Sequence, residues 1–568
     1  MKKYRNIYLA VALVSAASLC CTSCEDSLIE NPDSYYTRKD FFTNAANAEM
    51  AINGIYNILI TLYGEIDAQN AAASDDILYP SGGASKDNMR RDMGHYMLTT
   101  SNKSLETLWN GKYEQLNRAN YCIQNIEAMK GYAKDKELQK LVATARFFRA
   151  QAAFDLARYW GDVPFKTDYS SNYENAYQPR TNREKIYGQV IDDLNAAKEV
   201  LPWANAGSSP EKVTQGTVRA LLMRVLLTRA GYSMQMNGAL TRPNDAARKE
   251  YFNAVITEWA AFEESGYHGF YEGGYEALFK GFSEGVLNSK ESLFEVAFYY
   301  PGAKGYWGSY MGPTVATPNV PVGEASKYMG RANGSFRAVP EWRGFYEAQT
   351  DEAKTAIDKR RDVTICTYSY QWSDAEMNHT KKEDKTGRNW CPGKWRREWM
   401  PKGSTKDLNC TDINYCMFRY ADVVLMAAEA YNETGDTPKA WTLLNKVRER
   451  AGATQVNTLQ KYREVQPALY ALPYFNNGDE KDNFRTALYW ERGLELAFEG
   501  QRKHDLIRWG ILAEALQLFS TNSAANAGTN KAYLAGDNFK TGKHELLPIP
   551  LDEIQVNYKL EGKNNPGY

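Results

Sequence analysis

Three glutamates near the end of the chain have a spacing that could support acid–base chemistry. Glu491, Glu495 and Glu499 lie four residues apart, so a helix would place their carboxyl groups on one face. A glycosidase uses such a pair only where one carboxyl keeps a raised pKa in a cleft. Arg492 and Arg502 are close in sequence, and arginines keep neighbouring carboxylates ionised. The pattern therefore favours structural ion pairs, and we predict no catalytic residue.

Other catalytic and metal-binding patterns are weaker. Gly281-Phe-Ser-Glu-Gly285 matches the G-x-S-x-G motif of hydrolases, but it lacks the preceding apolar strand of a nucleophile elbow, so we interpret it as a loop. The sequence contains no H-E-x-x-H, P-loop or G-x-G-x-x-G motif. We predict no cofactor and no metal site; a structural calcium ion stays open, although no D-x-D-x-D-G loop supports it. The five histidines are scattered, at positions 95, 268, 379, 504 and 544.

Aromatic residues in irregular, glycine-rich surroundings favour sugar binding instead. Flat sugar faces stack on aromatic rings, and sugar hydroxyls need carboxylate, amide or guanidinium partners. Tyr306 and Trp307 lie between glycines, and Trp342 and Trp372 lie in the same irregular region. The alternative for Trp307, that it anchors its loop in the core, is equally open because burial is the commoner use of an aromatic residue. The candidate hydrogen-bonding residues lie in an early loop: Asp75, Asp76, Arg90 and Arg91.

The first 23 residues are typical of an export signal. Residues 1–23 combine a basic start with an apolar run that is too short to span a bilayer comfortably. Cys24 follows a small residue at the end of that run, which predicts lipidation at Cys24. The lipid would anchor the protein to the membrane without spanning it, and residues 24–40 would form a polar tether. Export would permit one disulfide among three later cysteines, Cys391, Cys410 and Cys416.

The rest of the chain divides by composition into helical and irregular regions. The 68 basic and 69 acidic residues balance, which argues against nucleic-acid binding. Helical periodicity dominates an N-terminal region, 41–266, and a C-terminal region, 409–568. Between them, 267–408 is rich in glycine, proline and aromatic residues, so we expect a loop-rich, partly β recognition insert.

The helical segments predict a mainly α fold. An apolar face runs from Leu141 to Trp160, and Gly161 and Pro164 predict a sharp stop. Ala430-x-x-x-x-Gly435-x-x-x-x-Ala440 resembles part of a tetratricopeptide repeat, with Gly435 opening the turn between two helices. We therefore expect degenerate tetratricopeptide-like helix pairs that form an α-solenoid scaffold.

Several sequence blocks resemble the SusD/RagB family of outer-membrane nutrient-binding lipoproteins. The first is A-x-x-x-F-x-L-x-R-Y-x-G-D-V-P at 150–164, and the second is the R-Y-A-D-V helix that begins at Arg419. The third is the E-R-x-x-E-L-A-F-E-G block at 491–500, and the last are L-P-I-P and N-P-G-Y at the end, where Asn564 replaces the usual Gln. The blocks cover the chain from end to end, except for the insert, which matches in position only.

The resemblance implies a function as well as a fold. It implies a lipoprotein on the outer face of the outer membrane that caps a SusC-like TonB-dependent transporter. The protein would capture an oligosaccharide, with the early loop and the insert as its binding face, and would break no bond. A peptide cargo, as for a RagB-like lid, stays an alternative; a glycosidase or esterase, or an accessory protein without a ligand, is less favoured.

Overall fold

The computed structural model describes residues 41–568 apart from 81–88, 348–355, 404–407, 469–474, 476–477, 521–522 and 524–532. The predicted leader, the tether and Cys24 therefore lie outside the described residues. Among the residues that are described, no helix is long and apolar enough to cross a membrane.

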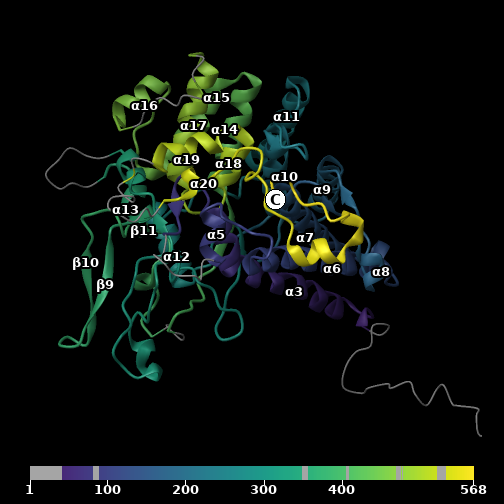
Figure 1. Ribbon diagram of the computed structural model, residues 1–568, viewed down its shortest axis with the longest axis horizontal. Coiled ribbons are helices and arrows are strands. Elements are labelled where there is room, and N and C mark those ends of the chain that lie inside the picture. The colour runs from purple at the N-terminus through teal and green to yellow at the C-terminus, as the bar shows by residue number, and fades with distance from the viewer. Residues whose placement is uncertain are drawn as a thin grey trace, which may run out of the picture.

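Helices packed side by side form most of the molecule, which confirms the prediction of a mainly α fold (Figure 1). Each long helix of the N-terminal region packs on the next long helix in sequence, and the last of them, α11, packs on α14 in the C-terminal region. The array is therefore continuous across the two regions, although the insert separates them in sequence. The helices of this array are α3 (Ala45–Thr61), α6 (Lys103–Glu127), α7 (Lys136–Trp160), α9 (Arg183–Lys198), α10 (Gln215–Ala230), α11 (Asp245–Ser265), α14 (Tyr420–Thr434), α15 (Thr437–Ala451) and α17 (Glu480–Leu496).

Helix α7 occupies the centre of the N-terminal region, between α6 and α9. It begins earlier than the sequence pattern indicates, because the Asp135 side chain accepts hydrogen bonds from the backbone N–H groups of Glu137 and Leu138. It ends as predicted: Gly161 has a φ of 75°, a conformation that other residues rarely adopt. Most of its residues are buried, including alanines that allow neighbouring helices to approach closely.

Helices α14 and α15 form the predicted tetratricopeptide-like pair. Gly435, with a φ of 103°, ends α14, and the Asp436 side chain caps α15 by accepting from the backbone N–H of Lys439. Ala430 and Ala440 are fully buried. The small residues identified in the sequence therefore do allow the two helices to pack closely.

The insert consists mainly of loops with short strands and short helical turns. Near the start of the insert, β6 (Ser292–Val296) pairs antiparallel with β12 (Tyr415–Arg419), which follows the end of the insert in sequence. A hairpin of β9 (Tyr368–Ser373) and β10 (Asn378–Glu383) extends away from the helices (Figure 1). The other pairs are two residues long: β1 (Ile77–Leu78) with β7 (Arg337–Ala338), β8 (Ile365–Cys366) with β11 (Cys391–Pro392), β2 (Val163–Pro164) with β3 (Arg180–Thr181), and β4 (Ser233–Met234) with β5 (Leu240–Thr241).

Shorter helices connect and cover these parts. They are α4 (Asp67–Ala71), α5 (Met89–Gly94), α8 (Tyr173–Ala176), α12 (Gly274–Glu284), α13 (Arg360–Thr364), α16 (Leu459–Val465), α18 (Arg502–Trp509), α19 (Leu512–Ser520), α20 (Ala535–Asn538) and α21 (Leu551–Val556). A π-helix, η2 (Leu62–Ile66), continues α3, and 3-10 turns occur at η3 (Tyr132–Lys134), η4 (Val322–Lys327), η5 (Pro340–Phe345), η6 (Arg397–Trp399) and η8 (Tyr558–Leu560).

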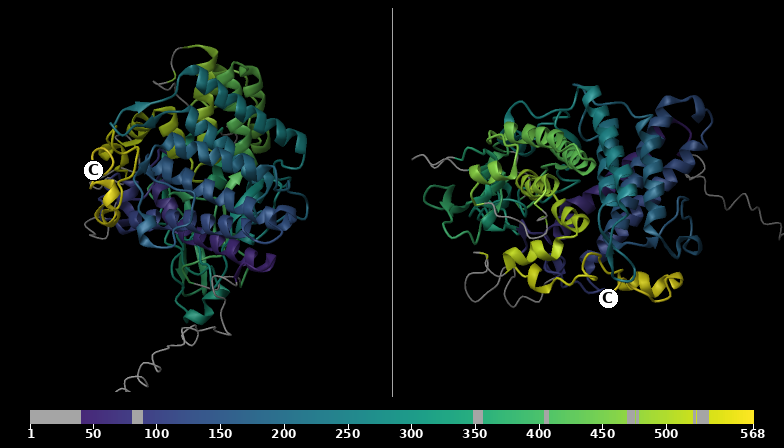
Figure 2. Two further views of the ribbon diagram at one scale, coloured as in Figure 1. Left: turned by 90° about the vertical axis from the view of Figure 1, so that its right-hand side faces the viewer. Right: turned by 90° about the horizontal axis from the view of Figure 1, so that it is seen from above.

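The end of the chain packs against the N-terminal helices (Figure 2). The Trp160 indole donates a hydrogen bond of 2.8 Å to the Pro548 carbonyl. The Asn565 amide donates in turn to the Trp160 carbonyl, at 2.9 Å, and the Arg180 guanidinium donates to the Asn565 side chain, at 2.8 Å. The L-P-I-P and N-P-G-Y blocks thus hold the first helical region together.

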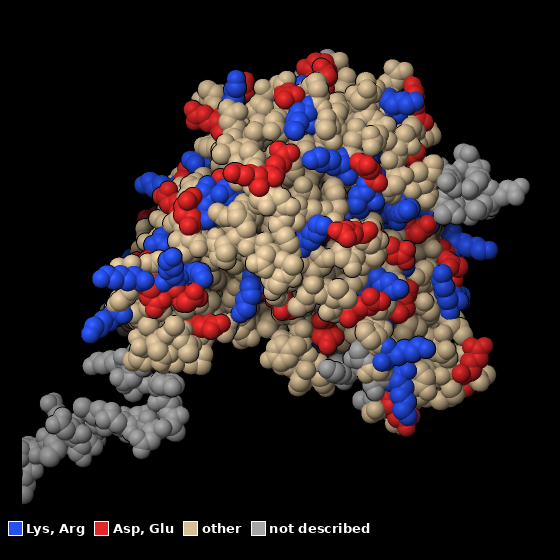
Figure 3. Space-filling view, turned by 180° about the vertical axis from the view of Figure 1, so that it is seen from behind, with Lys and Arg blue, Asp and Glu red and all other residues tan. Residues whose placement is uncertain are grey.

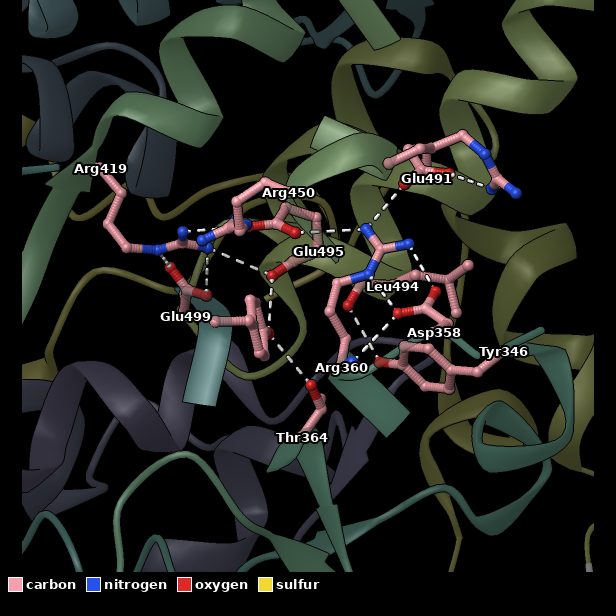
Figure 4. Close-up of polar contacts among 12 residues, drawn as sticks. Tyr346, Asp358, Arg360, Thr364, Arg419, Arg450, Glu491, Leu494, Glu495 and Glu499 are labelled. Carbon is pink, nitrogen blue, oxygen red and sulfur yellow. Dashed lines mark hydrogen bonds and ion pairs between the residues drawn. The ribbon is translucent and has the colours of Figure 1, made fainter. Parts of the chain in front are cut away.

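A buried network of ion pairs joins the insert to the C-terminal helices (Figure 4). Arg360 of α13 bonds Glu491 at 2.7 Å and Glu495 at 3.2 Å. Arg419, at the end of β12, bonds Glu495 at 3.0 Å and Glu499 at 2.7 Å. All three glutamates are buried. The prediction that they are structural partners of arginines is confirmed, although the arginines nearest in sequence, Arg492 and Arg502, pair with Asp505 and Asp75 instead.

The G-x-S-x-G segment does not form a nucleophile elbow. Ser283 lies in the last turn of α12, is buried, and accepts a hydrogen bond of 3.4 Å from the backbone N–H of Arg396. Gly285 ends the helix with a φ of 75°. An elbow needs a strand before the serine, so this position is structural, although it lies at a helix end and not in the loop that we expected.

Candidate functional site

The early-loop aspartates lie in the core. Asp75 accepts hydrogen bonds from Arg502 Nε at 2.7 Å and from the Tyr489 hydroxyl at 2.6 Å. Asp76 accepts from Ser74 Oγ at 2.6 Å and from the Phe498 backbone N–H at 3.1 Å; burial and the charge of Asp75 raise the pKa of Asp76. Both are buried, at 0% and 1% exposure. Their predicted contact with a ligand is therefore corrected to a structural role.

Trp342 is also structural. It lies in η5, is 1% exposed, and donates from its indole nitrogen to the Asp75 carbonyl at 2.8 Å. Its ring packs directly over Gly493 of α17, where an added Cβ would lie 2.3 Å from the ring. A side chain enclosed in this way has no surface for a sugar, so the predicted ligand role of Trp342 is corrected.

Trp307 confirms the alternative that it anchors its loop. Its indole nitrogen donates to the Tyr63 carbonyl at 2.9 Å, and its ring stacks on Tyr415 with centroids 4.5 Å apart. Trp395 covers another side, with ring centroids 4.6 Å apart, and Trp307 is only 3% exposed. The stacking partners of Trp307 are protein rings, so its predicted sugar contact is corrected.

The neighbouring Tyr306 keeps part of its surface accessible. Its ring stacks on that of Tyr310 with centroids 4.4 Å apart and an interplanar angle of 13°, and both tyrosines are half-buried. The Tyr306 carbonyl accepts from the backbone N–H groups of Ser309 and Tyr310, and Gly308, with a φ of 80°, provides the turn. The Tyr306–Tyr310 pair is thus a fixed aromatic surface beside the buried anchor Trp307.

Tyr310 was not among the site residues predicted from the sequence. The available signal was its position four residues after Tyr306 in a segment with two glycines, which would bring both rings to one side of a turn.

The other candidates lie on the β9–β10 hairpin and on α5. Trp372 of β9 is half-buried, donates to Asp374 Oδ1 at 2.7 Å, and meets Tyr328 and His379 edge-on. Arg91 is half-buried, and its guanidinium lies 5.6 Å from the centre of the Tyr79 ring. The side chain of Arg90 lies outside the described residues. Trp372 and Arg91 stay predictions.

A hollow in the insert adds residues that the sequence analysis did not select. Its volume is about 480 Å³, within the range of small-molecule sites. Half-buried Trp390 contributes an aromatic wall, and the Arg343 guanidinium lies 5.6 Å from the centre of its ring. Glu341, Lys385 and other polar side chains complete the lining. No sequence motif marks these residues, because they come from three separate segments: 340–346, Arg361 of α13 and 385–390.

The described cysteines and charges offer no metal centre. Among the described residues, no group of three or more His, Cys, Asp and Glu side chains is placed to hold a metal ion. The disulfide considered among Cys391, Cys410 and Cys416 does not form, since the Cys391 and Cys416 thiols are free. Cys391 instead lies opposite Cys366 in the β8–β11 pair, and Cys416 contacts Ser292.

On the face opposite that of Figure 1, basic and acidic side chains are interspersed (Figure 3).

Comparisons with known proteins agree with this architecture. Residues 290–568 match the model of the SusD family, and residues 28–227 match a model described as "Starch-binding associating with outer membrane". A SusD-like protein of Formosa agariphila is 26% identical over the full length of both chains. The crystal structure of a SusD homolog from Bacteroides thetaiotaomicron matches with a TM-score of 0.73 at 23% identity, over 94% of this chain and 99% of that one. A structure titled "Laminarin binding SusD-like protein" matches with a TM-score of 0.64 at 22% identity, over 93% and 100%.

The fold is that of SusD-like proteins of known structure, and the three glutamates are structural members of a buried ion-pair network. The chain belongs to the SusD/RagB family, a family of non-enzymatic binding proteins.

Proposed function

We propose that this protein captures oligosaccharides at the cell surface and delivers them to a SusC-like TonB-dependent transporter in the outer membrane. Lipid attached to Cys24 would anchor it, with 24–40 as a tether. The helical regions 41–266 and 409–568 would serve as scaffold, and the insert 267–408 would carry the cargo site. No bond in the cargo is broken.

The Tyr306–Tyr310 pair is the observation that carries this proposal. Two parallel rings on a fixed turn present a flat apolar face next to the polar groups of the backbone, which suits the C–H face of a pyranose. Trp307 holds the turn from beneath, so the rings lose little entropy when a ligand binds. The laminarin-binding relative supports a glycan as the cargo.

The test is binding of lipid-free protein, residues 25–568, to a panel of neutral and anionic oligosaccharides and peptides by calorimetry, with product analysis of the same samples. We expect glycan binding without new products. Tyr306→Ala and Tyr310→Ala should each weaken binding about tenfold, which corresponds to about 1.4 kcal/mol of lost stacking. Tyr251→Ala is the matched control, since Tyr251 is a half-buried tyrosine on the scaffold helix α11.

The outcomes separate the alternatives. Peptide binding in place of glycan binding would identify a RagB-like peptide lid, and released products would contradict a binding protein. Equal affinity of the Tyr306→Ala variant and wild type would refute the placement of the site on this pair.

The anchor and the transporter are tested in cells. Cys24→Ala should abolish incorporation of radiolabelled palmitate and move the protein from the membrane fraction to the soluble fraction. A SusC-like transporter is then purified from the same cells. Recovery of the wild-type protein with it, but not of unrelated lipoproteins, would support the proposed complex.

A further inference from the structure

A groove on the N-terminal helical region has the composition of a saccharide site. Its volume is about 320 Å³, at the lower end of the range for small-molecule sites. It lies between α6, the loop from Pro164 to Gln178 and the helix α21 near the end of the chain. Aromatic side chains and carboxamides line it together: Tyr113, Phe165 and Tyr177 with Asn110, Asn117 and Gln178.

The three aromatic residues are half-buried, so each has accessible surface within the groove. Tyr113 is held in place because its hydroxyl donates to the Pro164 carbonyl at 2.8 Å. Rings fixed at the wall of a narrow groove favour ligands that present flat apolar faces.

The carboxamides keep hydrogen-bonding capacity unused. Asn117 Oδ1 accepts from the Ser170 backbone N–H at 2.9 Å, but the Nδ2 group has no protein partner in the described part of the chain. Gln178 donates through Nε2 to Asn175, which leaves Oε1 without a partner there. The Asn110 side chain makes no hydrogen bond to any described residue and is exposed. Amide donors and acceptors of this kind are suited to hydroxyl groups.

The walls of the groove are fixed by hydrogen bonds between distant segments. Lys559 Nζ donates to the Tyr177 carbonyl at 2.7 Å, and Asn557 Nδ2 donates to the Gln178 carbonyl at 3.2 Å. Asn120 Nδ2 donates to the Lys166 carbonyl at 3.2 Å from the α6 side. The groove therefore exists before any ligand arrives, which lowers the entropic cost of binding.

The charge of the groove selects neutral ligands. Glu114 and Glu553 line it, and Lys166 is the basic residue among its described lining. Lys166 already lies 3.3 Å from Asp168, so it offers little to an anion. Glu114 is paired with Arg118, so Glu553 is the carboxyl group that would repel a uronate or a sulfated sugar, whereas a neutral sugar carries no charge to be repelled.

We propose that this groove is a second binding site, for a neutral mono- or disaccharide unit, independent of the insert. The proposal rests on the proposed function only in assuming that the cargo is a glycan. In Figure 1, α6 and α8 lie at the opposite end of the long axis from the β9–β10 hairpin. The two sites would therefore hold separate oligosaccharides or distant parts of one polysaccharide, and a polysaccharide would gain avidity from both.

The experiment combines calorimetry with crystal soaks, using cellotriose, laminaritriose, maltotriose and the anionic trigalacturonate as probes. Wild type and Tyr306→Ala, which weakens the insert site, are compared with Tyr177→Ala and Asn110→Ala. We expect a neutral probe in the groove of the Tyr306→Ala crystals, about tenfold weaker groove binding in Tyr177→Ala, and no binding of trigalacturonate there. Tyr558→Ala is the control, because Tyr558 lies beside Tyr177 but is 70% exposed and does not line the groove.

The outcomes distinguish the two proposals. Sugar in the insert but an empty groove in every soak would overturn the second site and leave the proposed function intact. Sugar in the groove alone would support the second site and overturn the Tyr306–Tyr310 site. Binding of no saccharide by wild type would overturn both. Because loss of folding could mimic loss of binding, each variant must first show an unchanged circular dichroism spectrum and melting temperature.

Discussion

The replacement of Glu495 by glutamine should destabilise the protein strongly at neutral pH and little at pH 2. Glu495 is fully buried and contacts Arg360 at 3.2 Å, Arg419 at 3.0 Å, and Arg450. Burial alone would raise its pKa, but the three arginines and a nearby lysine outweigh burial and lower the pKa to about 2, from 4.5. The native state therefore holds the charged form, and an amide cannot supply that charge.

The magnitude follows from the pKa difference. A folded-state pKa of about 2 against an ordinary value of 4.5 corresponds to about 3 kcal/mol, and removing one member of a buried ion pair costs about 3–5 kcal/mol. Since the folded pKa is depressed, this stability is present above pH 4.5 and is lost as the pH falls from about 4.5 to about 2. The two estimates agree that Glu495→Gln should cost about 3–5 kcal/mol at pH 7.

Urea unfolding from pH 2 to 8, followed by tryptophan fluorescence, measures the effect. Glu295→Gln is the matched control, because Glu295 is equally buried but burial raises its pKa to about 7. Its contribution has the opposite sign: stability is present below pH 4.5 and is lost as the pH rises towards 7, so Glu295→Gln should be harmless or stabilising at pH 8. Equal losses for both variants at pH 8 would refute the assignment of the ionised form to Glu495.

Three further outcomes are expected. Trp307→Ala should cost about 3–5 kcal/mol in urea unfolding, because it empties a core position; an unchanged melting temperature with lost glycan binding would contradict its anchoring role. Asp75→Ala should cost about 3–5 kcal/mol because it leaves Arg502 buried and unpaired, and Asp75→Ala/Arg502→Met should recover part of that loss. Cys366 and Cys391 lie opposite each other in the β8–β11 pair, so oxidised glutathione should form a disulfide between them within one chain. Intact mass and peptide mapping would detect it. A mixed disulfide with glutathione on either thiol alone would contradict the pairing.

Local patterns were sufficient to predict the long scaffold helices and the ends of α7 and α14, but not the start of α7 or the helix α12. The stop at Gly161 and the turn at Gly435 depend on a backbone conformation that favours glycine, so each can be identified from one residue and its neighbours. These two inferences needed no knowledge of distant contacts. The structural role of Glu495 was also predicted, but from Arg492 and Arg502, which pair with Asp505 and Asp75. The arginines that hold Glu495 are Arg360, Arg419 and Arg450, which are distant in sequence.

The candidate site was harder to predict because burial in loops depends on distant partners. Asp75 and Arg502 are 427 residues apart in sequence, and no local pattern pairs them. One local signal was available for Trp342: a glycine inside the E-R-G-L-E helix is unfavourable unless something packs closely against it. Gly493 is that glycine, and the Trp342 ring occupies the space that a side chain would need.

The contacts of Asn565 and Trp160 have a consequence for how the chain folds. The helix that ends at Trp160 gains two hydrogen bonds from residues about 400 positions later in the sequence, so these contacts form only after nearly the whole chain has been synthesised. The N-terminal half synthesised alone would expose the apolar surface that the final segment covers. We therefore expect a single cooperative unfolding transition, and expression of 41–266 without the last 25 residues should yield aggregation-prone material rather than an independent domain.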